Sequence, residues 1–107
     1  MVEVIASVLR EHGVTYRIGK TWTTDAFYRE TRTRVAKRKA EGCLTVEMEC
    51  AAFLAVSRFR SVAFGQILAT GDDVSGAEWD PRDWNSQAHL DFSDRLFWLS
   101  VHACLRL

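Results

Sequence analysis

The sequence has no excess of either charge, which excludes one class of partner. It contains 14 Lys and Arg residues against 14 Asp and Glu residues, so its formal net charge is +0. Binding to nucleic acid or to an anionic membrane depends mostly on contacts with phosphates, which a neutral chain does not favour as a whole. We therefore expect neither nucleic acid nor a membrane as a partner.

Long hydrophobic runs and a cysteine framework are also missing. No stretch reaches the roughly 18 consecutive apolar residues of a membrane span, and the start lacks the basic segment of a signal peptide, so we expect a cytoplasmic protein. The cysteines are odd in number and include no C-x-x-C pair, so we expect core residues rather than disulfides or a zinc site. The histidines have no metal-ligand spacing, and we expect no metal. These residues are Cys43, Cys50, Cys104, His12, His89 and His102.

The composition is typical of one globular domain over residues 1–107. Hydrophobic residues make up 48% of the 107 residues and charged residues 26%, a balance that argues against disorder. A chain of this length buries roughly two-thirds of its unfolded surface. That burial is enough for a hydrophobic core, but a chain of this length leaves little room for a complete small-molecule enzyme.

The hydrophobic pattern predicts alternating helices and strands. The expected elements are a helix from Val2 to a stop at His12, a strand over 14–24, a helix over 26–41 between Asp25 and Gly42 as caps, a strand over 44–48, a helix over 50–59, a strand over 62–69, a loop over 71–87 and a helix over 88–105. The helix over 50–59 is apolar nearly all round and should be buried. The strand over 62–69 is apolar on both sides, as in parallel sheets.

This order predicts an α/β fold, a partial doubly wound, Rossmann-like parallel sheet with flanking helices. Three strands are few for an open parallel sheet. The sheet would therefore have an apolar edge that something must cover. We expect self-association into a homo-oligomer, or pairing with a separate amino-terminal partner.

The segment Glu47-Met48-Glu49 ends a predicted strand and leads into a predicted helix. Ligands of α/β proteins bind at the carboxyl ends of strands, and a carboxylate there can accept hydrogen bonds from vicinal hydroxyls such as those of a ribose. The alternative is structural, with Glu49 as a helix N-cap and Met48 in the core.

Two further features have a chemical and a structural interpretation. Asp72 and Asp73 follow the strand over 62–69, where one of them could act as a general acid or cap loop N–H groups. Trp22 could stack on a flat base or pack in the core. The basic stretch over 29–39 is either a solvated helix face or a surface for phosphates or a partner.

Three segments resemble the carboxyl-terminal half of the nucleoside phosphorylase family, which includes uridine phosphorylase, hexameric purine nucleoside phosphorylase and related nucleosidases. They are Trp22 to Thr31, Val46 to Ala52 with Glu-Met-Glu before an alanine-rich helix, and Ala69 to Asp73 with Gly-Asp-Asp. The resemblance implies N-glycosidic bond cleavage of a nucleoside with ribosyl transfer to phosphate, a co-substrate, and no other cofactor.

The resemblance also implies roles for individual residues. Glu49 and Met48 resemble the ribose contacts with Glu47 as their support, Asp72 the acid that protonates a leaving base, and Trp22 the aromatic residue beside the base. Two departures stand out. Gly71 replaces the family's small hydroxyl residue, and only Arg82 is near enough in sequence to support Asp72.

The glycine-rich loop and the arginines that bind phosphate belong to the family's amino-terminal half, and nothing in the 107 residues matches them. We therefore expect half of an enzyme, with Met1 a truncated start, that binds nucleoside but does not turn it over alone. The alternative is a noncatalytic oligomerisation or interaction domain on the same scaffold.

Overall fold

The computed structural model describes residues 1–69, 71–82 and 86–107, and in these it contains two strands, four α-helices and one short 3₁₀ helix. The elements are α1 (Val2–Glu11), β1 (Lys20–Thr23), η1 (Phe27–Arg29), α2 (Arg32–Ala40), β2 (Cys43–Glu47), α3 (Cys50–Arg60) and α4 (Gln87–Cys104). Thr70 of the Gly-Asp-Asp segment and Asp83 to Asn85 of the predicted loop lie outside the described residues.

β1 and β2 pair in parallel, and α2 lies between them in the sequence. Trp22 lies opposite Val46, and Thr23 lies opposite Glu47. Parallel neighbours need a crossover connection, which η1 and α2 supply here. The predicted α/β class with a parallel sheet and flanking helices is therefore confirmed, with a small, two-stranded sheet.

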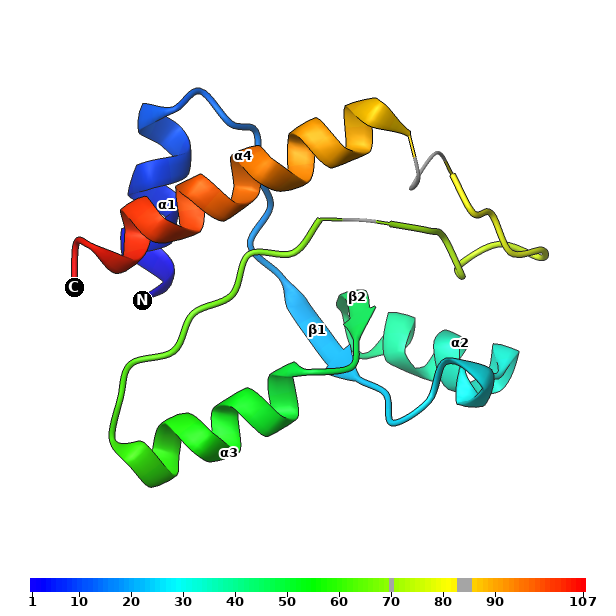
Figure 1. Cartoon of the computed structure of the whole chain (residues 1–107). Helices are drawn as coiled ribbons and strands as arrows, with labels where there is room; N and C mark the ends of the chain where they lie inside the picture. Colours follow the sequence, from blue (N-terminus) through cyan, green and yellow to red (C-terminus); the bar gives the residue numbers. More distant parts are fainter. Residues whose placement is uncertain (70, 83–85) are drawn as a thin grey trace.

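α1 and α4 pack against each other and hold the main core (Figure 1). Val8 and Leu9 of α1 meet Leu99 and Ala103 of α4, and all four side chains are buried. This contact brings the two ends of the chain close together (Figure 1). None of the described helices is long and apolar enough to cross a membrane.

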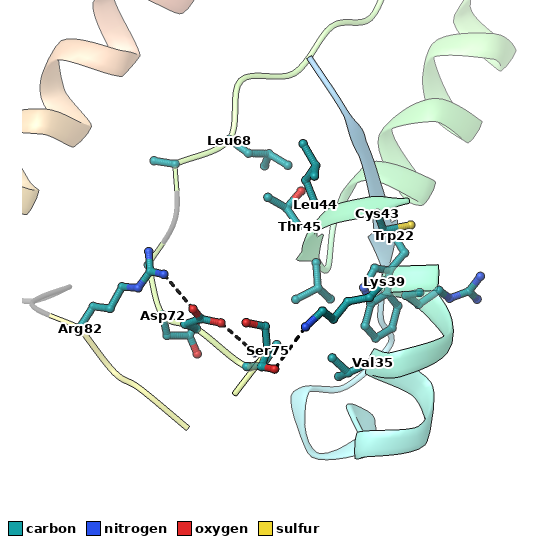
Figure 2. A pocket seen from close by; sticks show the side chains of 16 residues that line it. Trp22, Val35, Lys39, Cys43, Leu44, Thr45, Leu68, Asp72, Ser75 and Arg82 are labelled. Carbon is teal, nitrogen blue, oxygen red and sulfur yellow. Dashed lines mark hydrogen bonds and ion pairs between the residues drawn. The ribbon is translucent and has the colours of Figure 1, made fainter. Parts of the chain in front are cut away.

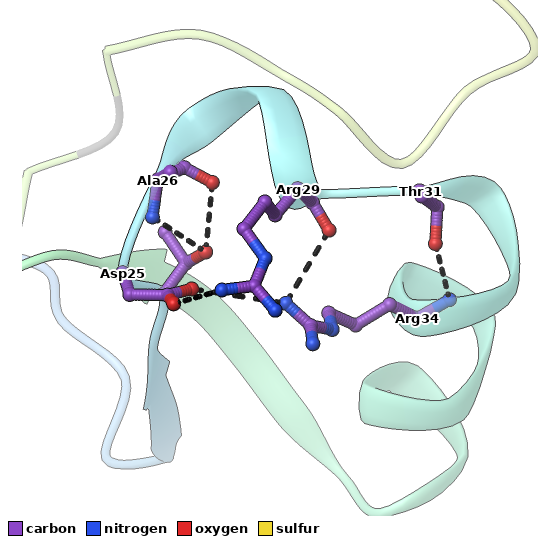
Figure 3. A network of polar contacts seen from close by, with 6 residues as sticks. Asp25, Ala26, Arg29, Thr31 and Arg34 are labelled. Atoms are coloured by element: carbon purple, nitrogen blue, oxygen red, sulfur yellow. Dashed lines mark hydrogen bonds and ion pairs between the residues drawn. The ribbon is translucent and has the colours of Figure 1, made fainter.

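The single helix predicted over 26–41 is wrong at its start. The chain forms η1 first, and α2 begins only after Thr31, whose side chain accepts a hydrogen bond from the Arg34 N–H at 3.4 Å. Asp25 does not cap a helix, because its carboxylate forms an ion pair with Arg29 (Figure 3). The prediction for Gly42 is correct, since it follows α2 with a φ of 83°, a conformation that favours glycine.

Of the three predicted strands, the one over 44–48 forms as β2, but one of the others is too long and one is absent. Of the strand predicted over 14–24 only β1 forms, and residues 62–69 form no strand. A strand needs a neighbour that completes its hydrogen bonds, and an apolar sequence alone does not provide one. In the described part of the chain, the 62–69 segment is a connection that runs from the end of α3 toward the loop (Figure 1).

α3 forms where predicted, but the expectation that it is buried is wrong. Among its side chains only Ser57 is buried, whereas Phe53 is 52% exposed and Phe59 84% exposed. Its apolar face has little to pack against in the described residues. The cysteines are not core residues either, because two are half-buried and Cys104 is exposed.

Candidate functional site

A cavity of about 240 Å³ lies between the edge of β2, α2 and the segment after residue 67 (Figure 2). Trp22 and Lys39 reach it from the side of β1 and α2, and Asp72 and Arg82 lie across from them (Figure 2). Four consecutive residues of β2, from Cys43 to Val46, contribute to its wall. The cavity is thus built by segments that are far apart in the sequence.

Trp22 lies in the wall of this cavity because it stands in β1 opposite Val46 of β2. The guanidinium carbon of Arg38 lies 5.6 Å from the centroid of the Trp22 ring, which is the distance of a cation–π contact. Arg38 also pairs with Glu41, at 2.7 Å between Nη1 and Oε2. One face of the indole is therefore supported by α2, and the ring is held in place.

Asp72 also lines the cavity, and its carboxylate has a partner from its own loop. The indole Nε1 of Trp79 donates a hydrogen bond of 2.7 Å to Asp72 Oδ2. The loop is closed by two backbone hydrogen bonds between Asp73 and Asp80. The arginine that the sequence offered as a support, Arg82, forms an ion pair with Asp73 at 2.9 Å.

The carboxyl group of Glu30 lies within electrostatic range of Asp72, which no local sequence pattern predicted. Burial raises the pKa of Glu30, and the negative charge of Asp72 raises it further. A carboxyl group that holds its proton more tightly beside a second carboxylate is a frequent feature of sites that transfer protons. The local sequence pattern does not encode this proximity, because residues 30 and 72 come from different segments of the chain.

The basic residues of α2 hold the loop that carries Asp72. Lys39 Nζ donates to the Ser75 carbonyl oxygen at 3.4 Å, and Arg32 donates to the Ala77 carbonyl oxygen at 3.0 Å. These contacts position the loop over the cavity. They give part of the basic stretch over 29–39 a structural role.

Glu47, at the end of β2, is the best-connected of the predicted site residues. Its Oε1 accepts a hydrogen bond of 2.6 Å from the Thr23 hydroxyl of β1. Its Oε2 accepts from the backbone N–H of Glu49, at 2.9 Å, and from that of Cys50. Its carboxylate thus caps the start of α3, where the free N–H groups of a helix favour negative charge.

The pKa of Glu47 reflects two opposing effects. Burial raises it, but the hydrogen bonds from the Thr23 hydroxyl and from the N–H groups at the start of α3 lower it, and a hydrogen bond from the Gln66 side chain adds to them. The sum is a pKa below the ordinary value, so Glu47 is ionised at neutral pH.

Met48 and Glu49 lie in the turn between β2 and α3, beyond the cavity wall. Met48 is 48% exposed, so it is not a core residue. Glu49 occupies the N-cap position of α3 but makes no side-chain cap; its Oε2 accepts from the Met48 N–H at 3.0 Å. Both side chains are accessible to a ligand.

The structure thus brings the predicted residues together in two groups. Trp22 and Asp72 share the cavity, and Glu47, Met48 and Glu49 form the adjoining turn at the end of β2. The two groups are linked by the strand register, because Thr23, next to Trp22, is the residue that binds Glu47. Glu47, Met48 and Glu49 do not line the cavity itself.

Comparison with known proteins identifies the family of the chain. The family model of the phosphorylase superfamily matches residues 1–96, so the chain belongs to that superfamily. The nucleoside phosphorylase resemblance of the sequence is thereby confirmed.

One relative is a purine nucleoside phosphorylase of the DeoD type from Exiguobacterium sibiricum. This chain is 32% identical to it over 69 residues, which cover 64% of this chain and 29% of the relative. The chain therefore matches less than a third of that relative's length. No solved structure matches the chain significantly.

Proposed function

We propose that this chain forms the part of a nucleoside phosphorylase that binds the base and the ribose, in an enzyme that cleaves the N-glycosidic bond of a nucleoside and transfers the ribosyl group to phosphate. The residues 1–107 would be one domain equivalent to the carboxyl-terminal half of such an enzyme. Its cytoplasmic location stays a prediction.

The observation that carries the proposal is that Trp22 and Asp72 face one cavity from opposite sides (Figure 2). An aromatic ring beside a carboxylate suits a flat heterocycle, because the ring stacks on its face while the carboxyl group bonds to its edge. The superfamily membership supports the same reading.

The ribose would extend from the cavity toward the end of β2. Val46 lines the cavity, and Met48 and Glu49 follow it two and three positions further along the chain. Glu49 would accept hydrogen bonds from the sugar hydroxyls, and Glu47 would keep the turn in place through its bonds to the backbone of Glu49 and Cys50.

The proposed reaction needs few further contributions from these residues. Cleavage of an N-glycosidic bond passes through an oxocarbenium-like transition state, so a carboxylate near the sugar stabilises the developing positive charge. Asp72, once protonated, would donate to the leaving base as its negative charge develops. Phosphate would attack the sugar, and no covalent bond to the protein is needed.

The test is to titrate the purified chain with inosine, adenosine and uridine, and to follow release of the free base with and without phosphate. We expect binding without rapid turnover, since no stretch of the sequence matches the phosphate loop of the family. Asp72→Asn should weaken binding of the preferred nucleoside by roughly tenfold, the effect of one lost hydrogen bond to a charged group.

Asp94→Asn is the matched control, because Asp94 lies exposed on α4 and does not line the cavity. It should bind as the wild type does. Absence of binding for all three nucleosides would contradict the proposed function. Rapid release of base that depends on phosphate would instead contradict the incomplete site.

A noncatalytic oligomerisation domain is the second candidate, and the apolar face of α3 favours it. Phe53, Val56 and Phe59 are each more than half exposed, at 52%, 58% and 84%. Such a patch is typical of a surface that contacts another protein. Under this hypothesis light scattering should show a stable oligomer, Phe59→Glu should dissociate that oligomer, and no nucleoside should bind.

A further inference from the structure

Two histidines from opposite ends of the sequence meet at the surface. His12 follows the last residue of α1, and His102 lies in the last turn of α4. Nε2 of His12 lies 3.3 Å from Nδ1 of His102, and the ring centroids are 5.2 Å apart. Both residues are exposed, so solvent and ions have access to the pair.

The separation of the two nitrogens suits a shared metal ion. In a tetrahedral zinc site each imidazole nitrogen lies about 2.0–2.1 Å from the metal, which places two such nitrogens about 3.3–3.4 Å apart. The observed 3.3 Å needs no movement of the helices. Each ring needs only to turn until its lone pair aims at a common point beside the line that joins the two nitrogens.

The helix ends that carry the pair are held in position by other contacts. Arg106 forms a bidentate ion pair with Glu11, at 2.8 and 2.6 Å, next to His12 and beyond His102. Arg95 donates to the His12 carbonyl oxygen at 3.0 Å. Buried contacts of Val8 and Leu9 with Leu99 and Ala103 also hold α1 against α4. The backbone segments that carry the two imidazoles are therefore held next to each other before an ion binds.

We propose that His12 and His102 form a surface site for a borderline transition-metal ion, with Zn²⁺ or Cu²⁺ as the cation, bound through His12 Nε2 and His102 Nδ1. Imidazole nitrogens suit these ions, whereas Mg²⁺ and Ca²⁺ prefer oxygen. In the described residues no group of three or more His, Cys, Asp or Glu side chains is placed to hold a metal, so water completes the coordination. The ion would tie α1 to α4.

The full chain offers a direct test with matched controls. Zn²⁺ is titrated into the wild type and into His12→Ala, His102→Ala, His89→Ala and Cys104→Ser. We expect one Zn²⁺ per chain, at least about tenfold weaker binding in the first two variants because each removes one of two ligands, and unchanged binding in the last two. Zn²⁺ should also raise the Tm of the wild type but not of His102→Ala.

Electron paramagnetic resonance of bound Cu²⁺ gives an independent readout. The wild type should show coupling to two imidazole nitrogens, and either single variant should show one or none. The proposal is overturned if Zn²⁺ does not bind, if only one of His12 and His102 is needed, or if the binding disappears in His89→Ala or Cys104→Ser. Binding of Mg²⁺ at the same affinity would equally exclude an imidazole site.

Discussion

The hydroxyl of Thr23 donates a hydrogen bond of 2.6 Å to the carboxylate of Glu47 and also accepts one of 3.1 Å from the backbone N–H of Ala51. One side chain of β1 thus joins the end of β2 to the first turn of α3. The Glu-Met-Glu turn is positioned through this contact, because Glu47 in turn binds the N–H groups of Glu49 and Cys50.

Replacing Thr23 should therefore loosen the turn. Thr23→Val keeps the shape but removes both hydrogen bonds, one of them to a charged group, and should lower the free energy of unfolding by roughly 1–3 kcal/mol. Urea denaturation measures the loss. Thr23→Ser retains the hydroxyl and is the control; an equal loss in both variants would mean that the methyl packing, and not the hydroxyl, matters.

The lowered pKa of Glu47 predicts how stability depends on pH. Because the folded chain lowers this pKa, the ionised carboxylate stabilises the fold above the unfolded pKa, and this contribution disappears as the pH falls through the folded pKa. The loss should begin at the ordinary range of a glutamate and continue below it.

Glu47→Gln should consequently be less stable than the wild type at about pH 7, and the difference should shrink as the pH falls through and below the ordinary range of a glutamate, because the wild-type carboxyl then becomes neutral as well. Chemical denaturation across this range measures both curves. A constant difference between the two proteins at every pH would contradict the prediction, because the charge would then play no part.

Local sequence was enough to predict those elements whose signals lie within a few residues. The end of α2 is an example, since Gly42 adopts the positive φ that a glycine tolerates best. Local sequence was not enough to predict the start of α2. Asp25 could either cap a helix or bind Arg29, and which of these occurs depends on the conformation of η1.

The remaining errors concern contacts that the local pattern does not encode. The 62–69 segment has the composition of a buried parallel strand, but strand formation depends on a neighbour. The pairing of Trp22 with Asp72 around one cavity was accessible only through the family resemblance, which placed both near a base. The approach of Glu30 to Asp72 and of His12 to His102 had no signal in the sequence at all.

The residue that ends α3 predicts a gain in stability. Ser61 has a φ of 53° and a ψ of 40°, the left-handed conformation in which a side chain is strained. Ser61→Gly should relieve this strain and raise the free energy of unfolding by about 1 kcal/mol. Ser61→Ala, which keeps a Cβ atom, should change little. A stabilisation by alanine as large as that by glycine would contradict this explanation.

The raised pKa of Glu30 predicts the opposite pH dependence to that of Glu47. Burial and the Asp72 carboxylate disfavour the ionised form, so the folded chain binds this proton more tightly than the unfolded chain does. Protonated Glu30 therefore contributes to the stability of the fold at a pH below its pKa in the unfolded chain. This contribution is lost as the pH rises through its pKa in the folded chain. Glu30→Gln, which is neutral throughout, should be more stable than the wild type at about pH 7 and similar to it at about pH 4.

The double variant Glu30→Gln, Asp72→Asn separates the two causes of this shift. If the Asp72 charge contributes, the gain from Glu30→Gln at about pH 7 is smaller in the Asp72→Asn background than in the wild type, because only the burial penalty remains to be removed. Thermal melts of the four proteins at the two pH values measure the cycle. An identical gain in both backgrounds would show that the two carboxyl groups do not interact, and burial alone would then explain the raised pKa of Glu30.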